Sequence, residues 1–180
     1  MRHLKLDLGC GWNKKEGFVG VDANSFDGVD IVFDLRQEPW PWDDNSVEDV
    51  YSRHFVEHLT GKERIIFFNE MYRVLKPGAI ARIITPHWSH ESAYGDPTHE
   101  WPPVTCWTYY YLNTAWRESY GPHVGYKCNF AYELSLSHDP NDQWVASKDM
   151  QTKILLMTRS VNTALDLTAQ LTKLTVNDNG

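Results

Sequence analysis

The sequence predicts a single α/β domain with a doubly wound, mostly parallel sheet of seven strands and an antiparallel edge strand. Three features support this fold. Short strand-like runs that end in glycine or aspartate fill the first part of the chain, one well-marked helix follows, and two more strand-like runs stand near the end. A length of 180 residues suits one domain with its own hydrophobic core.

Five of the strands are expected in the first half of the chain. Each is a short apolar or alternating run bounded by turn residues. The runs are Leu4–Leu8, Phe18–Asp22, Val29–Phe33, Glu48–Ser52 and Ala79–Thr85. The gaps after the first two are too short for a full crossover helix, so we expect some helices to be shortened or missing.

The clearest helix follows the fourth strand. Thr60 and Glu63 have the spacing of a capping box, in which each side chain accepts the other residue's backbone N–H. Apolar and aromatic residues then recur at helical spacing at Ile65, Phe68, Tyr72 and Leu75. The run Lys76–Gly78, with its proline and glycine, should end the helix.

The second half of the chain is less regular. Pro86–Lys127 is rich in aromatic residues, histidine and proline, with one expected helix near Thr105–Trp116. Cys128–Ser137 and Ala164–Leu174 read as strands that can pair at the antiparallel edge, and Asn141–Ser160 between them has helical character.

Composition narrows the class of partner. The net charge is −7 and Lys and Arg form no cluster, which disfavours extended nucleic acid and favours a small molecule. No run approaches the roughly 20 apolar residues of a membrane helix, so no membrane partner is expected. The three cysteines, Cys10, Cys106 and Cys128, are odd in number and scattered, which indicates a reducing, cytoplasmic location.

The strongest chemical signal is Leu6–Gly11 followed by Val19–Asp22. Glycines let the backbone turn sharply and approach a ligand, and an acidic residue at the end of a second strand can accept both hydroxyls of a ribose. A plain turn with a surface aspartate is the alternative. A nicotinamide enzyme would have a third glycine where this chain has Lys14, and a helix that holds phosphate. A ligand without phosphate therefore fits better.

Four stretches in this order resemble the class I S-adenosylmethionine (SAM)-dependent methyltransferases, particularly the small stand-alone type found in bacteria and phages. They span about the first 90 residues and are Leu6–Gly11, Val19–Asp22, Phe33–Leu35, and Val56–Leu59 followed by Glu70–Gly78. Asp96–His99 is similar to a loop in some of these enzymes. The resemblance implies a Rossmann-like domain over residues 1–180 that transfers the methyl group of SAM.

The resemblance also implies residue roles at the cofactor. Gly9 and Gly11 would lie against the methionine part of SAM, with Cys10 as a small residue in the same turn. Asp22 would bind the ribose. Asp34 would accept from the adenine amino group, and Leu35 would offer its backbone and pack on the ring.

Two further cofactor-site expectations concern strand ends. Asp7 is expected either to orient the glycine loop or to meet the ligand's ammonium group through water. The resemblance also implies that Ser52–His54, just past the fourth strand, would face the sulfonium and the acceptor. The chain departs from many relatives at Asn13, where they have a third glycine, and in the short gaps between the first strands.

The acceptor is narrowed by what is missing. Amino-methylating enzymes of nucleic acids often carry an Asp/Asn-Pro-Pro-aromatic run after the fourth strand, where this chain has Ser52–Phe55. Cysteine after proline, the usual nucleophile for cytosine carbon, is also lacking. We expect an oxygen or nitrogen atom of a small molecule as acceptor, with His54, His58 and His99 as candidate bases. Another SAM-using transferase, or a non-catalytic SAM- or nucleoside-binding module, is the alternative.

Pro86–Lys127 is expected to cover the acceptor side, because it leaves the end of the fifth strand. Its polar residues allow three interpretations: metal binding, an acceptor or base role, and a solvated loop; they are His87, His90, Glu91, Asp96, His99 and Glu100. Since no zinc-site spacing is recognised, no metal ligand is assigned. His99 is preferred as the acceptor-side residue because Asp96 could hold one ring nitrogen; the alternative is a turn in which Asp96 caps backbone amides.

A homodimer is also expected, because the missing helices should leave part of the sheet uncovered. Exposed apolar patches of more than a few hundred Å² usually find a partner. The competing possibility is that Pro86–Lys127 folds back over that surface.

Overall fold

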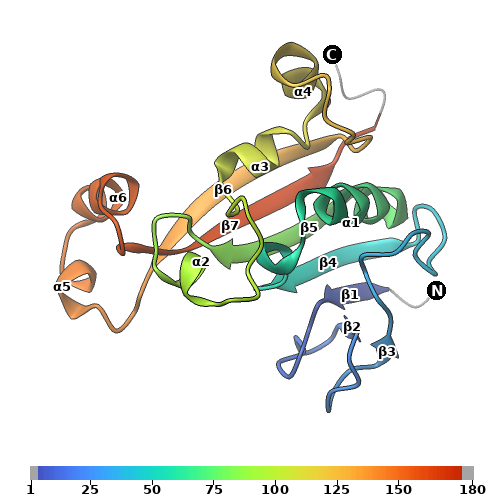
Figure 1. The fold of residues 1–180 in the computed structure, drawn as a ribbon, viewed down its shortest axis with the longest axis horizontal. Helices are drawn as coiled ribbons and strands as arrows, with labels where there is room; N and C mark the ends of the chain where they lie inside the picture. Colours follow the sequence, from blue (N-terminus) through green and yellow to red (C-terminus); the bar gives the residue numbers. More distant parts are fainter. Residues whose placement is uncertain (1–3, 176–180) are drawn as a thin grey trace.

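The computed structural model describes residues 4–175, which build one seven-stranded sheet of order β3-β2-β1-β4-β5-β7-β6 (Figure 1). The strands are β1 (Lys5–Leu8), β2 (Val19–Asp22), β3 (Ile31–Val32), β4 (Val47–Arg53), β5 (Leu75–Pro86), β6 (Phe130–His138) and β7 (Ala164–Lys173). The first five pair in parallel, and β7 runs antiparallel to both β5 and β6. The predicted fold class is confirmed.

Helices are few and mostly short. They are η1 (Val56–His58), α1 (Gly61–Val74), α2 (Ser92–Gly95), α3 (Cys106–Tyr110), α4 (Thr114–Tyr120), α5 (Gln143–Ala146) and α6 (Met150–Arg159). Within residues 4–175 no helix connects β1 to β2, β2 to β3 or β3 to β4. The helix expected near Thr105–Trp116 is two helices, because Asn113 caps α4 by accepting from the Trp116 amide at 3.1 Å.

The helix α1 begins as predicted and ends earlier. Thr60 and Glu63 form the capping box, with the Thr60 amide 2.8 Å from Glu63 Oε2. The helix ends at Val74 and the chain passes directly into β5, so Lys76–Gly78 belong to the strand. Lys173 of β7 takes the place of a glycine cap: its Nζ donates to the carbonyls of Tyr72 and Leu75, each at 2.7 Å.

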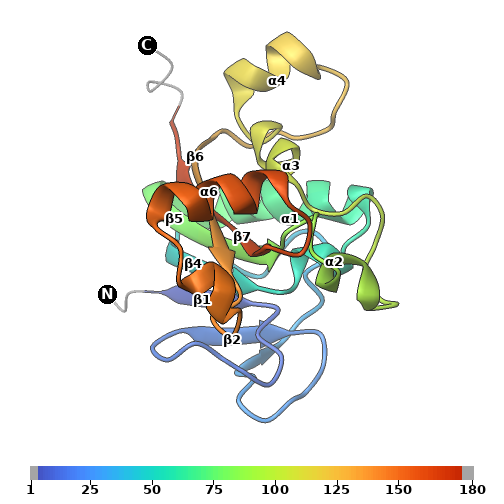
Figure 2. The same cartoon turned by 90° about the vertical axis from the view of Figure 1, so that its left-hand side faces the viewer.

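One face of the sheet carries the helices and the core. Figure 2 shows α1 and α3 on the same side of the sheet. Phe68 of α1 and Tyr109 of α3 are fully buried, with ring centroids 6.3 Å apart. Side chains of alternate strand residues meet them, among them Val50, Ala81, Ile83, Leu167, Ala169 and Leu171.

The opposite face of the sheet is polar. Arg82 of β5 donates to Gln170 of β7 at 3.3 Å, and Gln170 donates to Glu133 of β6 at 3.4 Å. The predicted absence of helices after β1 and β2 is therefore correct. Among residues 4–175 this face is mostly polar, with Ile80 of β5 exposed on it, and the homodimer stays a prediction. Residues 86–127 do not cover this face either, because α3 packs on the α1 side.

The β1–β2 connection replaces a helix with ion pairs and cation–π contacts on this polar face. Lys14 Nζ lies 2.9 Å from Asp30 Oδ2, and Asp30 also accepts from the Gly20 amide at 2.7 Å. Lys15 Nζ stands 4.6 Å from the centre of the Tyr51 ring. These contacts hold the loop on the sheet without helical hydrogen bonds.

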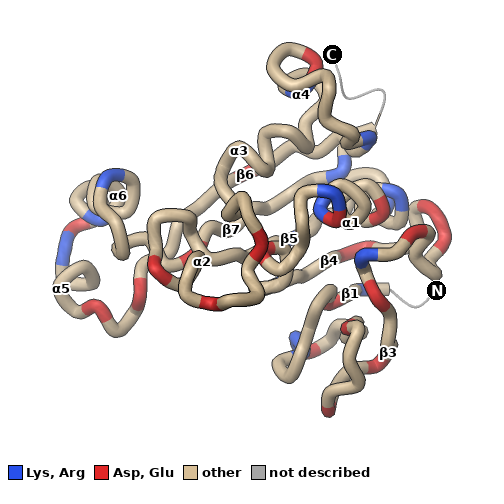
Figure 3. Tube along the Cα trace, viewed as in Figure 1, with Lys and Arg blue, Asp and Glu red and all other residues tan. Residues whose placement is uncertain are grey.

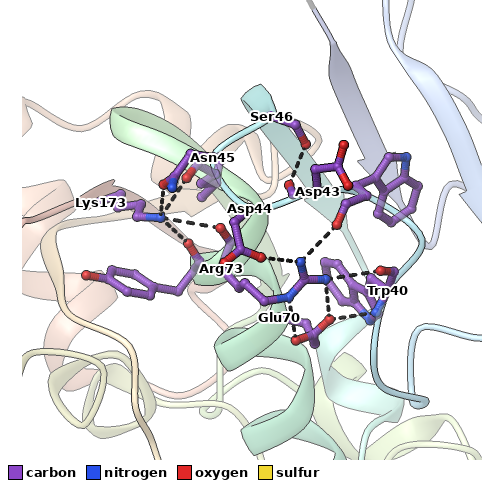
Figure 4. Close-up of polar contacts among 11 residues, drawn as sticks. Trp40, Asp43, Asp44, Asn45, Ser46, Glu70, Arg73 and Lys173 are labelled. Atoms are coloured by element: carbon purple, nitrogen blue, oxygen red, sulfur yellow. Dashed lines mark hydrogen bonds and ion pairs between the residues drawn. The ribbon is translucent and has the colours of Figure 1, made fainter.

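The β3–β4 connection is anchored to the end of α1 (Figure 4). Arg73 donates to Glu70 at 2.7 Å, to Asp44 at 2.7 Å and to the carbonyls of Trp40 and Trp42. Glu70 in turn accepts from the Trp40 amide at 2.6 Å. Because Trp40 Nε1 donates to the Leu35 carbonyl at 3.2 Å, this network also fixes the residues just after β3.

Charge is spread over the described chain. Figure 3 shows Lys and Arg on several separate elements, with acidic residues between them. This distribution offers no basic stripe along residues 4–175 of the kind that follows a nucleic-acid backbone. Across the same residues no helix is long and apolar enough to cross a membrane.

Candidate active site

A cavity of about 460 Å³ opens at the carboxyl ends of β1 and β4. These strands are parallel neighbours whose connections leave toward opposite faces of the sheet, which is where open α/β sheets bind ligands. Both strand ends and the β1–β2 loop form its wall: Asp7, Gly9, Cys10, Gly11, Trp12, Asn13, Lys15, Tyr51, Arg53 and His54. We call it the first cavity.

The two loop glycines are needed for different reasons. Gly9 has φ +70°, and a Cβ there would lie within 2.7 Å of three carbons of Phe55. Gly11 has φ +50°, but a Cβ there would meet nothing within 4 Å. Gly9 therefore allows the Phe55 side chain to pack against the backbone. Gly11 allows a left-handed turn beside open space.

Asp7 holds the shape of the loop. It is 2% exposed, and its Oδ2 accepts from the Lys15 amide at 2.7 Å, which agrees with the loop-orienting alternative. Burial raises the pKa of Asp7 above its usual value, against the Lys15 amide, which lowers it. Burial, with the charges of Asp7 and Asp22, raises the pKa of Cys10 to about 11, so its thiol is not an activated nucleophile.

Asp22 and Asp34 stand at the ends of the neighbouring strands β2 and β3, beyond the wall of the first cavity. Asp22 accepts from the Gly11 amide at 3.0 Å and from the Asn24 amide at 2.9 Å. Asp34 is held by Arg36 through two bonds of 2.8 and 3.0 Å, which lower its pKa despite partial burial. Leu35 is buried beside them at 2% exposure.

Ser52 lies elsewhere than the sequence indicated. The strand β4 continues through Arg53, and alternation turns Ser52 to the helix side while Tyr51 and Arg53 face the cavity. Its buried hydroxyl donates to the Leu8 carbonyl at 2.8 Å and ties β4 to β1. Ser52 thus supports the cavity from behind and does not line it.

His54 lies between two cavities. It has a positive φ of 54° and lines both the first cavity and a second cavity of about 590 Å³. Its Nε2 is 3.1 Å from Oδ1 of Asp166 on β7, a residue that nothing in the local sequence pointed to. The second cavity is lined by His54, Glu57, His58, Pro86, Ser92, Gly95, Asp96, Pro97, His99, Leu165 and Asp166.

His58 and His99 come together in the second cavity, with ring centroids 4.7 Å apart. Nδ1 of His58 is 2.9 Å from Oγ1 and 3.3 Å from the carbonyl oxygen of Thr98, and Nδ1 of His99 is 3.1 Å from the Ala93 carbonyl. A carbonyl only accepts, so both rings carry the proton on Nδ1 in the neutral form and leave the Nε2 lone pair free. Burial lowers the pKa of His58.

The expected Asp96–His99 bond is replaced by the alternative turn. Asp96 Oδ1 accepts from both the amide and the hydroxyl of Thr98, at 2.8 and 2.6 Å. Asp96 therefore shapes the turn, and the Ala93 carbonyl orients His99.

Glu57 belongs to the Val56–Leu59 stretch of the family resemblance, but the sequence did not predict that its carboxylate is buried. The side chain is 5% exposed, and neither carboxylate oxygen finds a hydrogen-bond partner of good geometry among the described residues. Burial raises the pKa of Glu57 to about 7, against the opposing effects of its own backbone amide and His54.

Arg64 of α1 fastens the two halves of the second cavity together. Its Nε donates to the Val56 carbonyl at 3.2 Å and its Nη1 to the Pro102 carbonyl at 2.7 Å. The Glu100 amide also donates to the Glu57 carbonyl at 2.8 Å. The loop that carries His99 is thus fixed against η1.

Only the first part of Pro86–Lys127 reaches this cavity. Its aromatic residues Trp88, Trp101 and Trp107 line a separate groove along α1. His87 and His90 are bonded to serine hydroxyls two residues later, at 2.8 and 2.7 Å, and do not join His99. None of the aromatic residues expected to cover the acceptor side lines the second cavity, to which this segment contributes only residues between Pro86 and His99.

Comparisons with known proteins agree with this architecture. Residues 17–83 match the family model described as a methyltransferase domain. A SAM-dependent methyltransferase from Archaeoglobus fulgidus is similar in structure, with a TM-score of 0.68, 21% identity, and coverage of 95% of this chain and 86% of that one. No curated protein matches the chain in sequence.

Two further solved structures extend the likeness in fold. A SAM-dependent methyltransferase from Methanosarcina mazei gives a TM-score of 0.59 at 17% identity and covers 97% of this chain and 94% of that one. A geranyl diphosphate C-methyltransferase from Streptomyces coelicolor gives 0.56 at 13% identity, over 96% of this chain and 71% of that one.

Proposed function

We propose that this chain is a class I SAM-dependent methyltransferase that methylates an oxygen or nitrogen atom of a small molecule in the second cavity. The matched methyltransferase-domain model and the shared fold support the first part of the proposal. The observation that carries the proposal is His54, which lines both cavities. A donor in the first cavity and an acceptor in the second would meet at this residue, as an in-line transfer requires.

The first cavity has charged groups that could bind the carboxylate and the ammonium group of the methionine part of SAM. Lys15 and Arg53 offer cations for a carboxylate, and the buried Asp7 offers an anion for an ammonium group. Open space beside Gly11 leaves room for the ligand, and Asp22 stands at the next strand end for the ribose. We assign Asp34 and Leu35 to the adenine end, where Arg36 would have to release Asp34.

When bound, SAM supplies an electrophilic methyl group on its sulfonium. The chain's part is to orient the acceptor and to take its proton. Asp166 holds His54 through Nε2, so the neutral ring keeps a lone pair on Nδ1. We assign the base role to His54, with His58 and His99 contacting the acceptor from the far wall through Nε2.

A small acceptor is supported by charge and by shape. The chain has a net charge of −7, and the second cavity holds about 590 Å³, the size of a small-molecule site. An extended polyanion would find no basic track along the described elements.

The test is conversion of SAM to S-adenosylhomocysteine with a panel of small alcohols, phenols and amines. Once an acceptor is found, His54→Gln should lower kcat by about 100-fold or more, the usual contribution of a positioned base. His90→Gln, outside both cavities, is the matched control and should keep the parent rate. Equal rates for the parent and His54→Gln would refute the base role.

Two other outcomes separate the alternatives. SAM binding without turnover on any acceptor would favour a binding module. Products that carry an aminopropyl or carboxymethyl group, seen by mass, would favour another SAM-using transferase. SAM at a hundredfold excess over Kd should raise the free energy of unfolding by about 2.7 kcal/mol, and the melting temperature with it. NADH should change neither.

A further inference from the structure

We propose that Glu57, His58 and His99 form a binding site for one divalent transition-metal ion in the wall of the second cavity. The inference rests on the proposed function only where it makes this cavity the acceptor site. Two imidazoles and one carboxylate are a donor set that zinc and non-haem iron use when they keep positions open for a substrate.

The three side chains already converge. One potential ligand atom from each lies within 4.8 Å of the others. Metal–ligand bonds of about 2.0–2.2 Å place ligand atoms roughly 3–3.5 Å apart, so side-chain rotation inward closes the site.

The two histidines are oriented as metal ligands usually are. Each Nδ1 faces a backbone carbonyl, that of Thr98 for His58 and that of Ala93 for His99. Such carbonyl contacts fix the tautomer and direct the Nε2 lone pair outward, as in most metal-bound histidines. His87 and His90 in the same segment lack this arrangement, because their Nδ1 atoms accept from the backbone amides of Ser89 and Ser92.

Glu57 is the second, independent observation. Its carboxylate is buried and neither oxygen meets a partner among the residues described. A buried carboxylate is costly unless it is paired or bound to a metal. The nearby cation Arg64 does not neutralise it by contact, since its donors go to the carbonyls of Val56, Pro102 and Glu100.

The position of this cluster gives the ion a role. It lines the same cavity as His54 and Asp166, so an ion held by these three side chains would lie beside the space assigned to the acceptor. A metal-bound hydroxyl or thiol has a lowered pKa and a fixed position. The acceptor class would then be a small molecule that carries a metal-coordinating oxygen, nitrogen or sulfur.

The experiment titrates the full chain, freed of metal with a chelator, with Zn²⁺ by calorimetry and with Co²⁺ by visible absorption. We expect one ion per chain and cobalt bands of a coordinated site. Glu57→Gln and His99→Ala should each weaken Zn²⁺ binding more than about 100-fold, since loss of an outer contact alone costs about 10- to 100-fold. His90→Ala, in the same histidine-rich segment, should bind as the parent does.

SAM binding is measured on the same samples, because it separates this proposal from the proposed function. Glu57→Gln and His99→Ala should keep the parent's SAM affinity, which also shows that they are folded. Unchanged Zn²⁺ binding in both variants, or no one-to-one binding by the parent, overturns the metal site while leaving the cofactor assignment intact. If the parent protein does not bind SAM, the proposed function is overturned instead.

Discussion

Replacing Gly9 with alanine should destabilise the chain far more than the same change at Gly11. Both residues have a left-handed φ, +70° and +50°, so each substitution costs about 1–2 kcal/mol in backbone strain. Only at Gly9 does the added Cβ overlap another group, since three carbons of Phe55 would lie within 2.7 Å. Overpacking of this kind costs about 1–3 kcal/mol more.

The expected losses are therefore about 2–5 kcal/mol for Gly9→Ala and about 1–2 kcal/mol for Gly11→Ala. For a domain of this size, each kcal/mol lowers Tm by about 2–4 °C, so the two variants should differ by about 2–12 °C. Thermal unfolding followed by circular dichroism, without SAM, measures this difference free of any effect on ligand binding.

A double-mutant cycle identifies the cause. In a Phe55→Ala background the two ring carbons are gone and only the Phe55 Cβ contact at 2.7 Å remains, so Gly9→Ala should cost less than in the parent and approach the backbone term of about 1–2 kcal/mol. The reasoning is refuted if Gly9→Ala is no more destabilising than Gly11→Ala, or if its cost is the same with and without the Phe55 ring.

Three other predictions follow from the site and its supports. Asp22→Ala should lower SAM affinity at least ~10-fold by calorimetry. Asp30→Ala, which also frees a backbone amide but one on β2, away from the glycine loop that Asp22 contacts, should not; normal binding by Asp22→Ala would show that Asp22 has a structural role only. Arg73→Met should lower the free energy of unfolding, measured with urea, by about 2–3 kcal/mol. The loss is smaller than for a fully buried ion pair because water reaches Arg73, and in a Glu70→Leu background much of it should disappear. Cys10 should be alkylated slowly at pH 8 and faster as pH rises toward its pKa of about 11, because only the thiolate reacts; rapid modification at pH 8, followed by mass spectrometry, would contradict that pKa.

Features written within a few neighbouring residues were predictable from the sequence. The capping box of Thr60 and Glu63 specifies its own hydrogen bonds, and the helix begins where it should. The short gaps after β1 and β2 forbid a crossover helix by length alone. The glycine loop beside the first cavity follows from the same local information.

Ser52 could have been placed better from the sequence. The alternation within the predicted strand Glu48–Ser52 already puts Ser52 on the buried face with Val50, and Tyr51 on the other. The expectation that Ser52 faces the ligand did not carry that alternation through to the last residue of the strand. The period-two pattern carried the needed signal.

Asp166, Arg64 and Lys173 could not be placed by any local rule. Asp166 reaches His54 across 112 positions of sequence because β7 pairs antiparallel to β5 and sets Asp166 opposite Pro86. Arg64 and Lys173 likewise act on carbonyls 38 and 98 positions away. Such contacts depend on strand order and register, which only the assembled sheet determines.

The absent helices and the proposed chemistry are compatible because they concern different sides of the sheet. The helices that are lacking would have covered the polar face, where Lys14–Asp30 and Lys15–Tyr51 contacts now hold the β1–β2 loop. The second cavity is built instead from η1, the His99 loop and β7, and Arg64 of α1 braces it from the covered side. The lack of helices on the polar face therefore removes no residue to which we assign a role in methyl transfer. It does leave the adenine end of the donor site on surface loops, where Asp22 and Asp34 are held by loop amides and Arg36.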